Sequence, residues 1–170
     1  MVNPLLNEQF SYLAKKGSMI WSFGAVIFSG FIFATTLVLQ AYSRGATPDL
    51  ARVRTWYFGG AILSIVAWAV LSFLSYFIAL LLLHTSKPSL DFTAFLRVSG
   101  YALIPFAFWS VPWIGWLIPI IGVYLWILAS KHGFESDLEK AVIISLPIIV
   151  AYLFVAIVPS FPLTTFRGTD

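Results

Sequence analysis

The chain alternates long apolar runs with short polar linkers. A helix that crosses the roughly 30 Å hydrocarbon core of a bilayer needs about 20 apolar residues, and the first two runs exceed this length. The pattern predicts an all-α fold, a polytopic transmembrane helix bundle over residues 18–160 with a short tail at 161–170. The spans, about five in number, are predicted at about residues 18–42, 56–83, 92–110, 113–130 and 140–158.

The segment before the first span, residues 1–17, has a different pattern. Leu6, Phe10 and Leu13 fall on one side of a helix, and polar residues fall on the other. Pro4 fits the first helical position. The segment is therefore predicted to be a short amphipathic helix in the membrane interface. The alternative is a frayed tail.

The polar linkers contain residues that start, cap or end helices. Thr47 and Pro48 form a cap followed by a first-turn proline, so the helix of the second span is predicted to begin near Pro48. The other predictions of this kind are a cap at Asp91, a helix stop at Gly133, a capping box from Ser136 to Glu139, and a kink at Pro147.

The stretch between Arg97 and Lys131 holds 33 uncharged residues and three prolines. As one helix it would be about 50 Å long, which is more than one crossing needs. Pro112 and Gly115 offer a tight turn, and the stretch is predicted to be a hairpin of two bent helices. One tilted helix or a re-entrant loop is the alternative. Kinks are predicted at the remaining prolines, Pro105 and Pro119.

Composition supports a membrane location and excludes several functions. The chain is 60% hydrophobic and 10% charged, against roughly 25% charged residues in a soluble domain. The net charge of +3 comes from scattered basic residues, so no nucleic-acid partner is expected. No span has a charge near its centre, which argues against proton pumping and ion-coupled transport. Arg97 is expected to extend back to the headgroups.

We find no pattern typical of an enzyme, and we predict no catalytic residue, no cofactor and no metal. The sequence has no cysteine, no Gly-x-Ser-x-Gly elbow and no P-loop. His84 and His132 lack acidic partners at helical spacing, so we interpret them as interfacial residues rather than metal ligands. The acidic residues Glu135, Asp137 and Glu139 are interpreted as helix-capping groups, with a cation or docking site as the alternative.

Small residues recur at helical spacing in the first two spans. Ala25 with Ser29, and Gly60 with Ser64, form small-xxx-small pairs that favour close helix packing. Packing within the bundle is the preferred interpretation, and dimerisation is the alternative. Tyr101 is expected to pair its hydroxyl with a carbonyl freed by a nearby kink, with partner recognition as the alternative.

The second half of the chain resembles the Ypt-interacting-protein (Yip) family of five-span membrane proteins, in the form of its small prokaryotic members. The likeness covers about residues 97–155, whereas the first two spans match in hydropathy alone. It is carried by Gly100-Tyr101-Ala-Leu-Ile-Pro105, Pro112-Trp-Ile-Gly115, Lys131-His132-Gly133 and Lys140-Ala141.

The resemblance implies a cytoplasmic N-terminus and an external C-terminus, in the cell membrane if the source is prokaryotic. Six basic residues on the N-terminal side of the spans, against four on the other, favour the same orientation. Eukaryotic relatives are linked to Rab GTPases. The sequence has neither their long N-terminal region nor their Asp-Leu-Tyr-Gly-Pro motif, which puts binding of a Rab-type GTPase in doubt.

Three functional hypotheses follow. The first is a non-catalytic Yip-type scaffold that binds other integral membrane proteins or itself, or organises the surrounding lipid bilayer. The second is an auxiliary subunit of a larger membrane complex, such as a respiratory or transport assembly. The third is a channel or small-solute transporter.

Overall fold

The computed structural model describes residues 4–83, 90–108, 111 and 117–157, and for 154–157 the backbone alone. All regular structure in these residues is helical. The elements, in chain order, are α1 (Pro4–Lys16), α2 (Met19–Ser43), α3 (Leu50–Leu83), α4 (Phe92–Ala102), the 3-10 helix η1 (Ile104–Phe108), α5 (Ile118–Gly133), α6 (Leu138–Ile144) and α7 (Leu146–Ile157).

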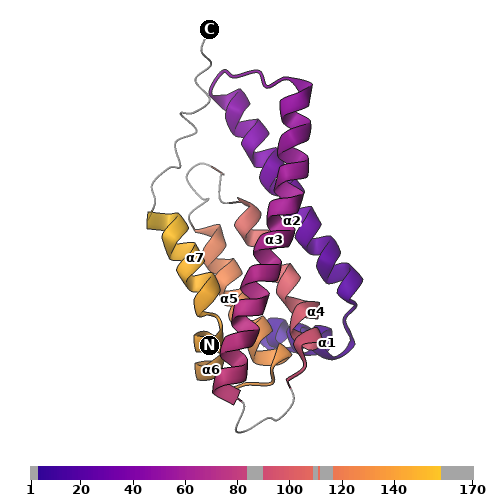
Figure 1. The fold of residues 1–170 in the computed structure, drawn as a ribbon, viewed down its shortest axis with the longest axis vertical. Helices are drawn as coiled ribbons and strands as arrows, with labels where there is room; N and C mark the ends of the chain where they lie inside the picture. Colours follow the sequence, from indigo (N-terminus) through magenta and orange to yellow (C-terminus); the bar gives the residue numbers. More distant parts are fainter. Residues whose placement is uncertain (1–3, 84–89, 109–110, 112–116, 158–170) are drawn as a thin grey trace.

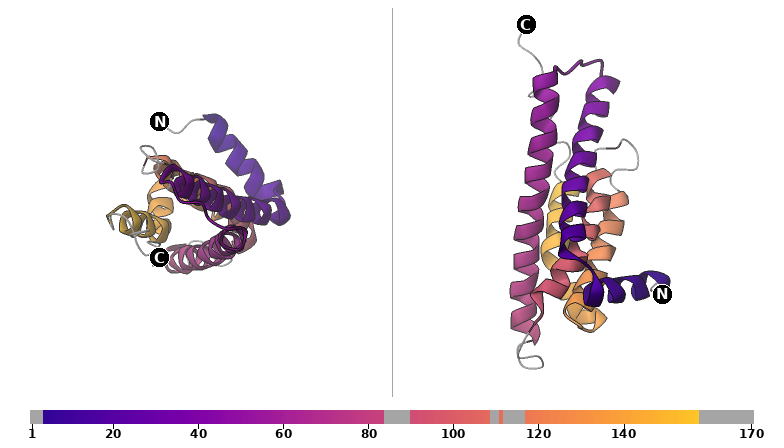
Figure 2. Two further views of the ribbon diagram at one scale, coloured as in Figure 1. Left: turned by 90° about the horizontal axis from the view of Figure 1, so that it is seen from above. Right: turned by 90° about the vertical axis from the view of Figure 1, so that its right-hand side faces the viewer.

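The chain runs back and forth along one axis (Figure 1). α2 rises from the end where α1 lies, and α3 returns antiparallel beside it. α4 and η1 rise again, α5 descends, and α6 with α7 rises last. α1 lies across the lower end of the bundle (Figure 2). A helix precedes the first apolar run, as the sequence predicts, and its place in the membrane interface remains a prediction.

In the part of the chain that the structure describes, two helices, α2 and α3, are long and apolar enough to cross a membrane. α3 has 34 residues, or about 51 Å of helix, whereas α5 has 16. The α2–α3 pair consequently extends beyond the shorter helices at its upper end (Figure 2). The prediction of an all-helical fold is confirmed for the described residues. The five-span count remains a prediction.

An aromatic cluster forms the lower core. Phe95 stacks on Phe134, with ring centroids 4.6 Å apart, and meets the edge of Trp126 at 5.6 Å. Tyr76 of α3 packs on Phe92 at 4.6 Å. These rings join α3, α4 and α5 near the end where α1 lies.

Several predicted helix boundaries are corrected by the structure. α3 begins at Leu50, and Asp49 rather than Thr47 caps it, because Asp49 Oδ1 accepts from the Arg52 backbone N–H at 2.7 Å. Asp91 caps α4 as predicted, accepting from Ala94 N at 3.0 Å. Pro119 is the second residue of α5 rather than a kink inside a span, a position where its missing N–H costs no helical hydrogen bond.

α5 ends at the predicted stop, but the start of the next helix differs from the prediction. Gly133 is the last residue of α5, and Glu135 adopts the left-handed backbone, with φ of 47°. The capping box is wrong, because Asp137 is the N-cap of α6 and the Ser136 hydroxyl donates to Ser130 O at 3.4 Å. The predicted break near Pro147 lies at Ser145, between α6 and α7.

Candidate functional site

The glycine of the Gly-Tyr-x-x-x-Pro segment lies where α2 crosses α4. The Ser22 hydroxyl donates to Leu96 O at 2.6 Å and accepts from Gly100 N at 3.2 Å. It is thus inserted between the two groups that would form the helical hydrogen bond of that turn. A Cβ on Gly100 would collide with the Ser22 hydroxyl and its carbonyl oxygen. Glycine is therefore required here for close approach, and the sequence pattern did not identify Ser22.

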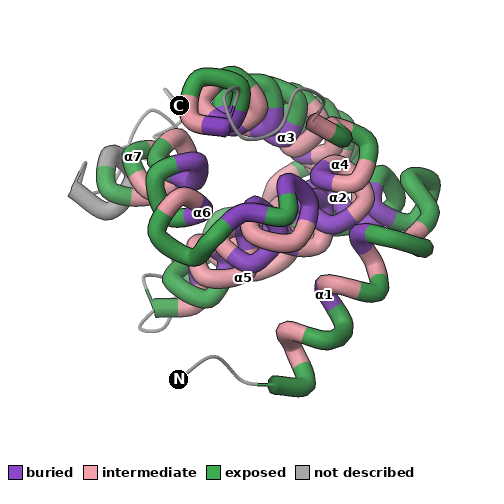
Figure 3. Tube along the Cα trace, turned by 90° about the horizontal axis from the view of Figure 1, so that it is seen from below, coloured by how far each residue is buried: buried purple, intermediate pink, exposed green. Residues whose placement is uncertain are grey.

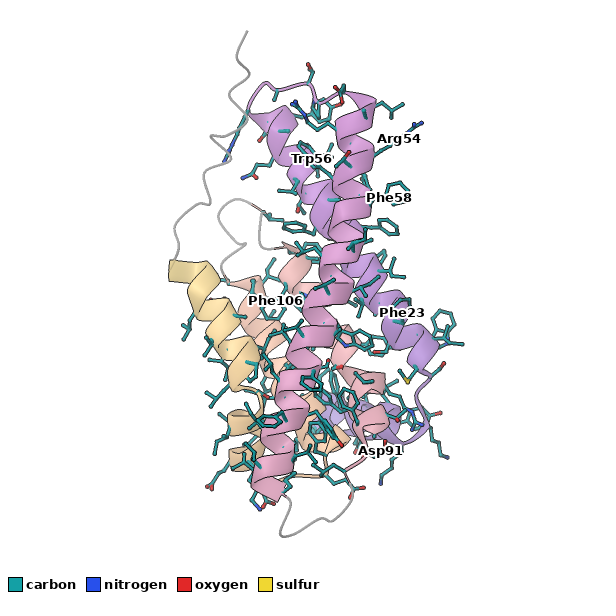
Figure 4. The ribbon with its side chains drawn as sticks, viewed as in Figure 1. Phe23, Arg54, Trp56, Phe58, Asp91 and Phe106 are labelled. Carbon is teal, nitrogen blue, oxygen red and sulfur yellow. The ribbon has the colours of Figure 1, made fainter. Side chains whose placement is uncertain are left out.

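Two glycines of α5 bring it equally close to the rising segment of α4 and η1. A Cβ on Gly122 would strike the Phe106 ring, which is labelled in Figure 4. A Cβ on Gly133 would lie 2.5 Å from the Cα of Phe95. Pro105 lies within η1, where the α-helical pattern of α4 has ended. The segment is consequently held on both sides by backbone-to-backbone contact.

α2 and α3 meet at a pair of glycines, only one of which the sequence pattern identified. A Cβ on Gly60 would lie 2.6 Å from the carbonyl oxygen of Gly30, and one on Gly30 would lie 2.5 Å from that of Gly60. Ala25 and Ser29 are buried, and Ser64 is half-buried. Gly30 was missed, although it directly follows Ser29 on the same packed face.

Buried polar side chains join the helices of the bundle. Among the described residues, those classed as buried and polar are all serine or threonine, and none carries a charge. Figure 3 shows that buried residues gather where the helices face one another, whereas the outer turns of α3 are exposed. Three buried side-chain hydrogen bonds link different elements: Trp68 Nε1 to Ser99 Oγ (2.8 Å), Trp126 Nε1 to Ser75 Oγ (3.2 Å), and Ser130 Oγ with Ser145 Oγ (3.0 Å).

These serines and tryptophans were not identified from the sequence. On α3 the buried positions Trp68, Ser72, Ser75 and Ala79 follow a 4-3-4 spacing, which is typical of one packed helix face and could have marked them. Ser72 differs from its neighbours because its hydroxyl is buried without a hydrogen-bond partner.

The remaining predicted positions do not join this network. Tyr101 is half-buried, and no hydrogen bond of its hydroxyl is recorded among the described residues. Pro119 is buried at the start of α5. Pro112 and Gly115, the predicted turn of the hairpin, lie outside the described residues.

Polar and basic groups gather at the lower end, between α1 and the end of α5. Arg97 extends toward α1, where its Nη1 donates to Ala14 O at 3.2 Å and to Lys15 O at 3.4 Å, carbonyls of the last turn. Asn7 Oδ1 lies 2.8 Å from His132 Nε2 and accepts from Lys131 Nζ at 3.3 Å. These contacts fasten α1 to the bundle.

The electrostatic surroundings of His132 disfavour its protonation. Burial lowers the pKa of His132 below its usual value, and the neighbouring charges of Lys131 and Lys15 lower it further. No cluster of three potential metal-ligating side chains occurs in the described ranges. Of the acidic residues near the end of α5, Asp137 occupies the N-cap position of α6 without a side-chain capping hydrogen bond, and Glu139 lies in the first turn, where a carboxylate suits the helix dipole.

Comparison with known proteins identifies the family. The model of the Yip1 domain matches residues 1–158, so the match includes the first two spans, where the sequence pattern gave a likeness in hydropathy alone. A search of curated proteins and a search of solved structures each found no match. The apolar helices and the tightly packed Gly-Tyr-x-x-x-Pro segment agree with the family match, and the chain belongs to the Yip1 family.

Proposed function

We propose that this membrane protein is a non-catalytic scaffold that binds other integral membrane proteins, or a second copy of itself, and organises the lipid around them. The observation that carries the proposal is that polar side chains inside the bundle form hydrogen bonds with one another. The buried Trp–Ser and Ser–Ser pairs connect α3, α4, α5 and the α6–α7 junction to one another. A bundle whose interior groups serve its own packing offers its outer surface for interaction.

The outer surface suits this role. Large apolar side chains along α3 are exposed, including Phe58 at 72%, Phe73 at 63% and Leu81 at 69%. Phe58 projects outward from the upper part of α3 in Figure 4. Lipid tails or the helices of a partner would cover such a face.

We further propose that five segments cross the cell membrane: α2, α3, α4 with η1, α5, and α6 with α7. The N-terminus would be cytoplasmic and the C-terminus outside. The arrangement of charges supports this orientation. Lys15 of α1, Lys131 in the last turn of α5 and Arg97, which contacts α1, belong to the lower end, whereas Arg54 lies at the upper end (Figure 4).

An auxiliary subunit of a larger membrane complex is the second candidate. The observation that favours it is the upper part of the α2–α3 pair, which extends past the shorter helices (Figure 2). A neighbouring subunit could cover this protruding part.

Extraction from the native membrane in mild detergent tests both candidates. Native gel bands would be sized and their composition determined by mass spectrometry. A scaffold predicts a band of monomer or dimer size, with partners recovered after cross-linking in the membrane. A stable large assembly with stoichiometric subunits would contradict the scaffold and support the auxiliary subunit. A monomer band with no cross-linked membrane protein would contradict both.

A further inference from the structure

A concave surface lies between α1 and the end of α5. Asn7, Ser11 and Lys15 follow one another at intervals of four residues, so they share one face of α1. This face lines the depression together with Lys16 and His132. Tyr12 and Glu8 complete the lining, and Glu8 is its one carboxylate.

The cations at this surface are not needed to cap the helix ends. At the end of α1, Gly17 N donates to Leu13 O at 2.7 Å, and Arg97 donates hydrogen bonds to the carbonyl oxygens of Ala14 and Lys15. At the end of α5, the backbone N–H groups of Phe134 and Ser136 donate to Ser130 O and Lys131 O, at 3.2 and 2.9 Å. Basic residues in a last turn commonly serve as capping groups, but these carbonyls already have partners.

Among the described residues, no ion pair is recorded for these cations. The ion pair that is recorded there joins Lys140 to Asp137 at 3.9 Å. Lys131 Nζ and His132 Nε2 both contact Asn7 Oδ1, at 3.3 and 2.8 Å, on the face of α1 that also carries Lys15. Like charges that converge in this way repel one another, and a bound anion would relieve the repulsion.

The position of the depression favours a phospholipid over a soluble anion. Lys15 and Lys16 directly precede the apolar helix α2, and Lys131 lies in the last turn of α5. Exposed apolar side chains surround the site: Leu5 at 68% and Tyr12 at 62% on α1, and Trp21 at 72% on α2. Aromatic and basic residues together are typical of the headgroup region.

We propose that the surface between α1 and the end of α5 binds the phosphate of an anionic phospholipid, held by Lys15, Lys16 and Lys131 and by the Ser11 hydroxyl. The site goes beyond the proposed scaffold function and does not depend on it. It would keep α1 against the headgroups and draw anionic lipid to one side of the bundle.

Lipid binding to the purified full-length protein tests the proposal. Phosphatidylglycerol and phosphatidylcholine with identical acyl chains would be titrated separately in detergent, and bound lipid would be counted by native mass spectrometry. We expect the protein to prefer phosphatidylglycerol about ten-fold, because several cations near a headgroup attract its charge and salt screens part of that attraction. Equal binding of the two lipids would overturn the proposal, and this comparison needs no variant.

Two triple variants locate the site. Lys15→Gln with Lys16→Gln and Lys131→Gln should reduce the preference to about two-fold or less. Arg44→Gln with Arg52→Gln and Arg54→Gln removes the same charge from the opposite end and should leave it unchanged. An equal loss in both would indicate non-specific attraction and overturn the site. If the first variant does not fold, Lys16→Gln alone should still lower the preference, since Lys16 is exposed.

Inorganic phosphate distinguishes a headgroup site from a soluble-anion site. Added at a concentration equal to that of the lipid, it should leave phosphatidylglycerol bound, because the acyl chains hold the lipid in place. Displacement at that ratio would assign the site to a soluble anion and contradict the lipid proposal.

Histidine NMR supplies a second readout, because the chain has two histidines and His84→Gln leaves His132 alone. The charged groups around His132 are Glu8, Lys15 and Lys16 of α1, Lys131 of α5, Arg97 and Asp91 at α4, and Glu135 after α5. A bound phosphate would raise the pKa of His132, so phosphatidylglycerol should raise it and phosphatidylcholine should not. An unchanged pKa with lipid bound would place the lipid elsewhere.

Discussion

The two halves of this bundle reach stability in different ways. The α2–α3 pair is long, continuous and apolar, and its helices meet at the Gly30–Gly60 crossing and again where Thr35 Oγ1 lies 2.9 Å from the Tyr57 hydroxyl. The half from α4 to α7 consists of short helices interrupted at Leu103 and Ser145. It is held by glycine contacts on both sides of α4 and η1 and by a buried Ser–Ser pair, and buried Trp–Ser pairs join it to α3. The first half can be located from length and hydrophobicity, whereas the second depends more on individual contacts.

The largest effect is expected at Gly100. A leucine there would force the Ser22 backbone away from α4, and overpacking of this kind costs about 3 kcal/mol or more when the obstacle is backbone. Unfolding in SDS, followed by tryptophan fluorescence, measures the loss. Gly24→Leu is the control, because a Cβ on Gly24 meets nothing within 4 Å. Equal stability of the two variants would contradict the close crossing.

Neighbouring glycines on α3 test the first half in the same assay. Gly60→Ala should destabilise the protein by about 1–3 kcal/mol, because the new methyl group meets the Gly30 carbonyl at 2.6 Å. Gly59→Ala should stabilise it by up to about 1 kcal/mol, because Gly59 faces open space and alanine favours the helix. Effects of the same sign would show that α2 and α3 do not meet at Gly60.

A smaller effect is expected from the buried serines. Ser99→Ala leaves Trp68 Nε1 without its partner at 2.8 Å and should cost about 1 kcal/mol. Ser72→Ala is the matched control, because the buried Ser72 hydroxyl has no partner to lose and its removal should be neutral or stabilising. Lower stability of Ser72→Ala than of Ser99→Ala would be incompatible with the hydrogen-bond network.

The smallest effect concerns pH and the attachment of α1. The pKa of His132 is lowered in the folded state by burial, Lys131 and Lys15, so the unfolded state, with a pKa near 6.5, binds the proton more readily. The stability contribution is therefore complete above about pH 6.5 and is lost as pH falls through the folded-state pKa. The protection factors of the α1 amides, which are corrected for the intrinsic pH dependence of exchange, should fall between pH 7.5 and 5.5, and His132→Gln should remove this dependence. A similar pH dependence in the variant would exclude His132 as the cause.

Much of the fold could be predicted from the sequence. Uninterrupted apolar runs indicate α2 and α3 because a membrane span requires little beyond length and hydrophobicity. Asp91 could be predicted as a cap because its side chain acts within one turn of its own helix. The sequence could not decide between two possible caps of the same helix, Thr47 and Asp49. The residue that acts as cap depends on where the helix begins, and packing against the rest of the bundle determines that position.

The packing partners could not be predicted, because they depend on which faces meet. The motif that contains Gly100 can be recognised in the sequence, but glycine is required there because of Ser22, which lies 78 residues earlier. Arg97 was expected to extend to the headgroups, and the sequence did not indicate its contact with the end of α1. Gly133 ends α5 as predicted, but the sequence did not indicate its close approach to Phe95. Each missed contact joins segments far apart in the chain.

The central claim is that both halves cross the membrane, in five spans, and single cysteines test it most directly. The natural sequence has no cysteine, so each engineered thiol gives an unambiguous signal with a membrane-impermeant maleimide. In intact cells we predict labelling at Ala46→Cys and Thr169→Cys, and labelling of Glu135→Cys only after lysis. Labelling of Thr169→Cys only after lysis, with Glu135→Cys unchanged, would place both residues on one side and contradict the crossing by α6 and α7.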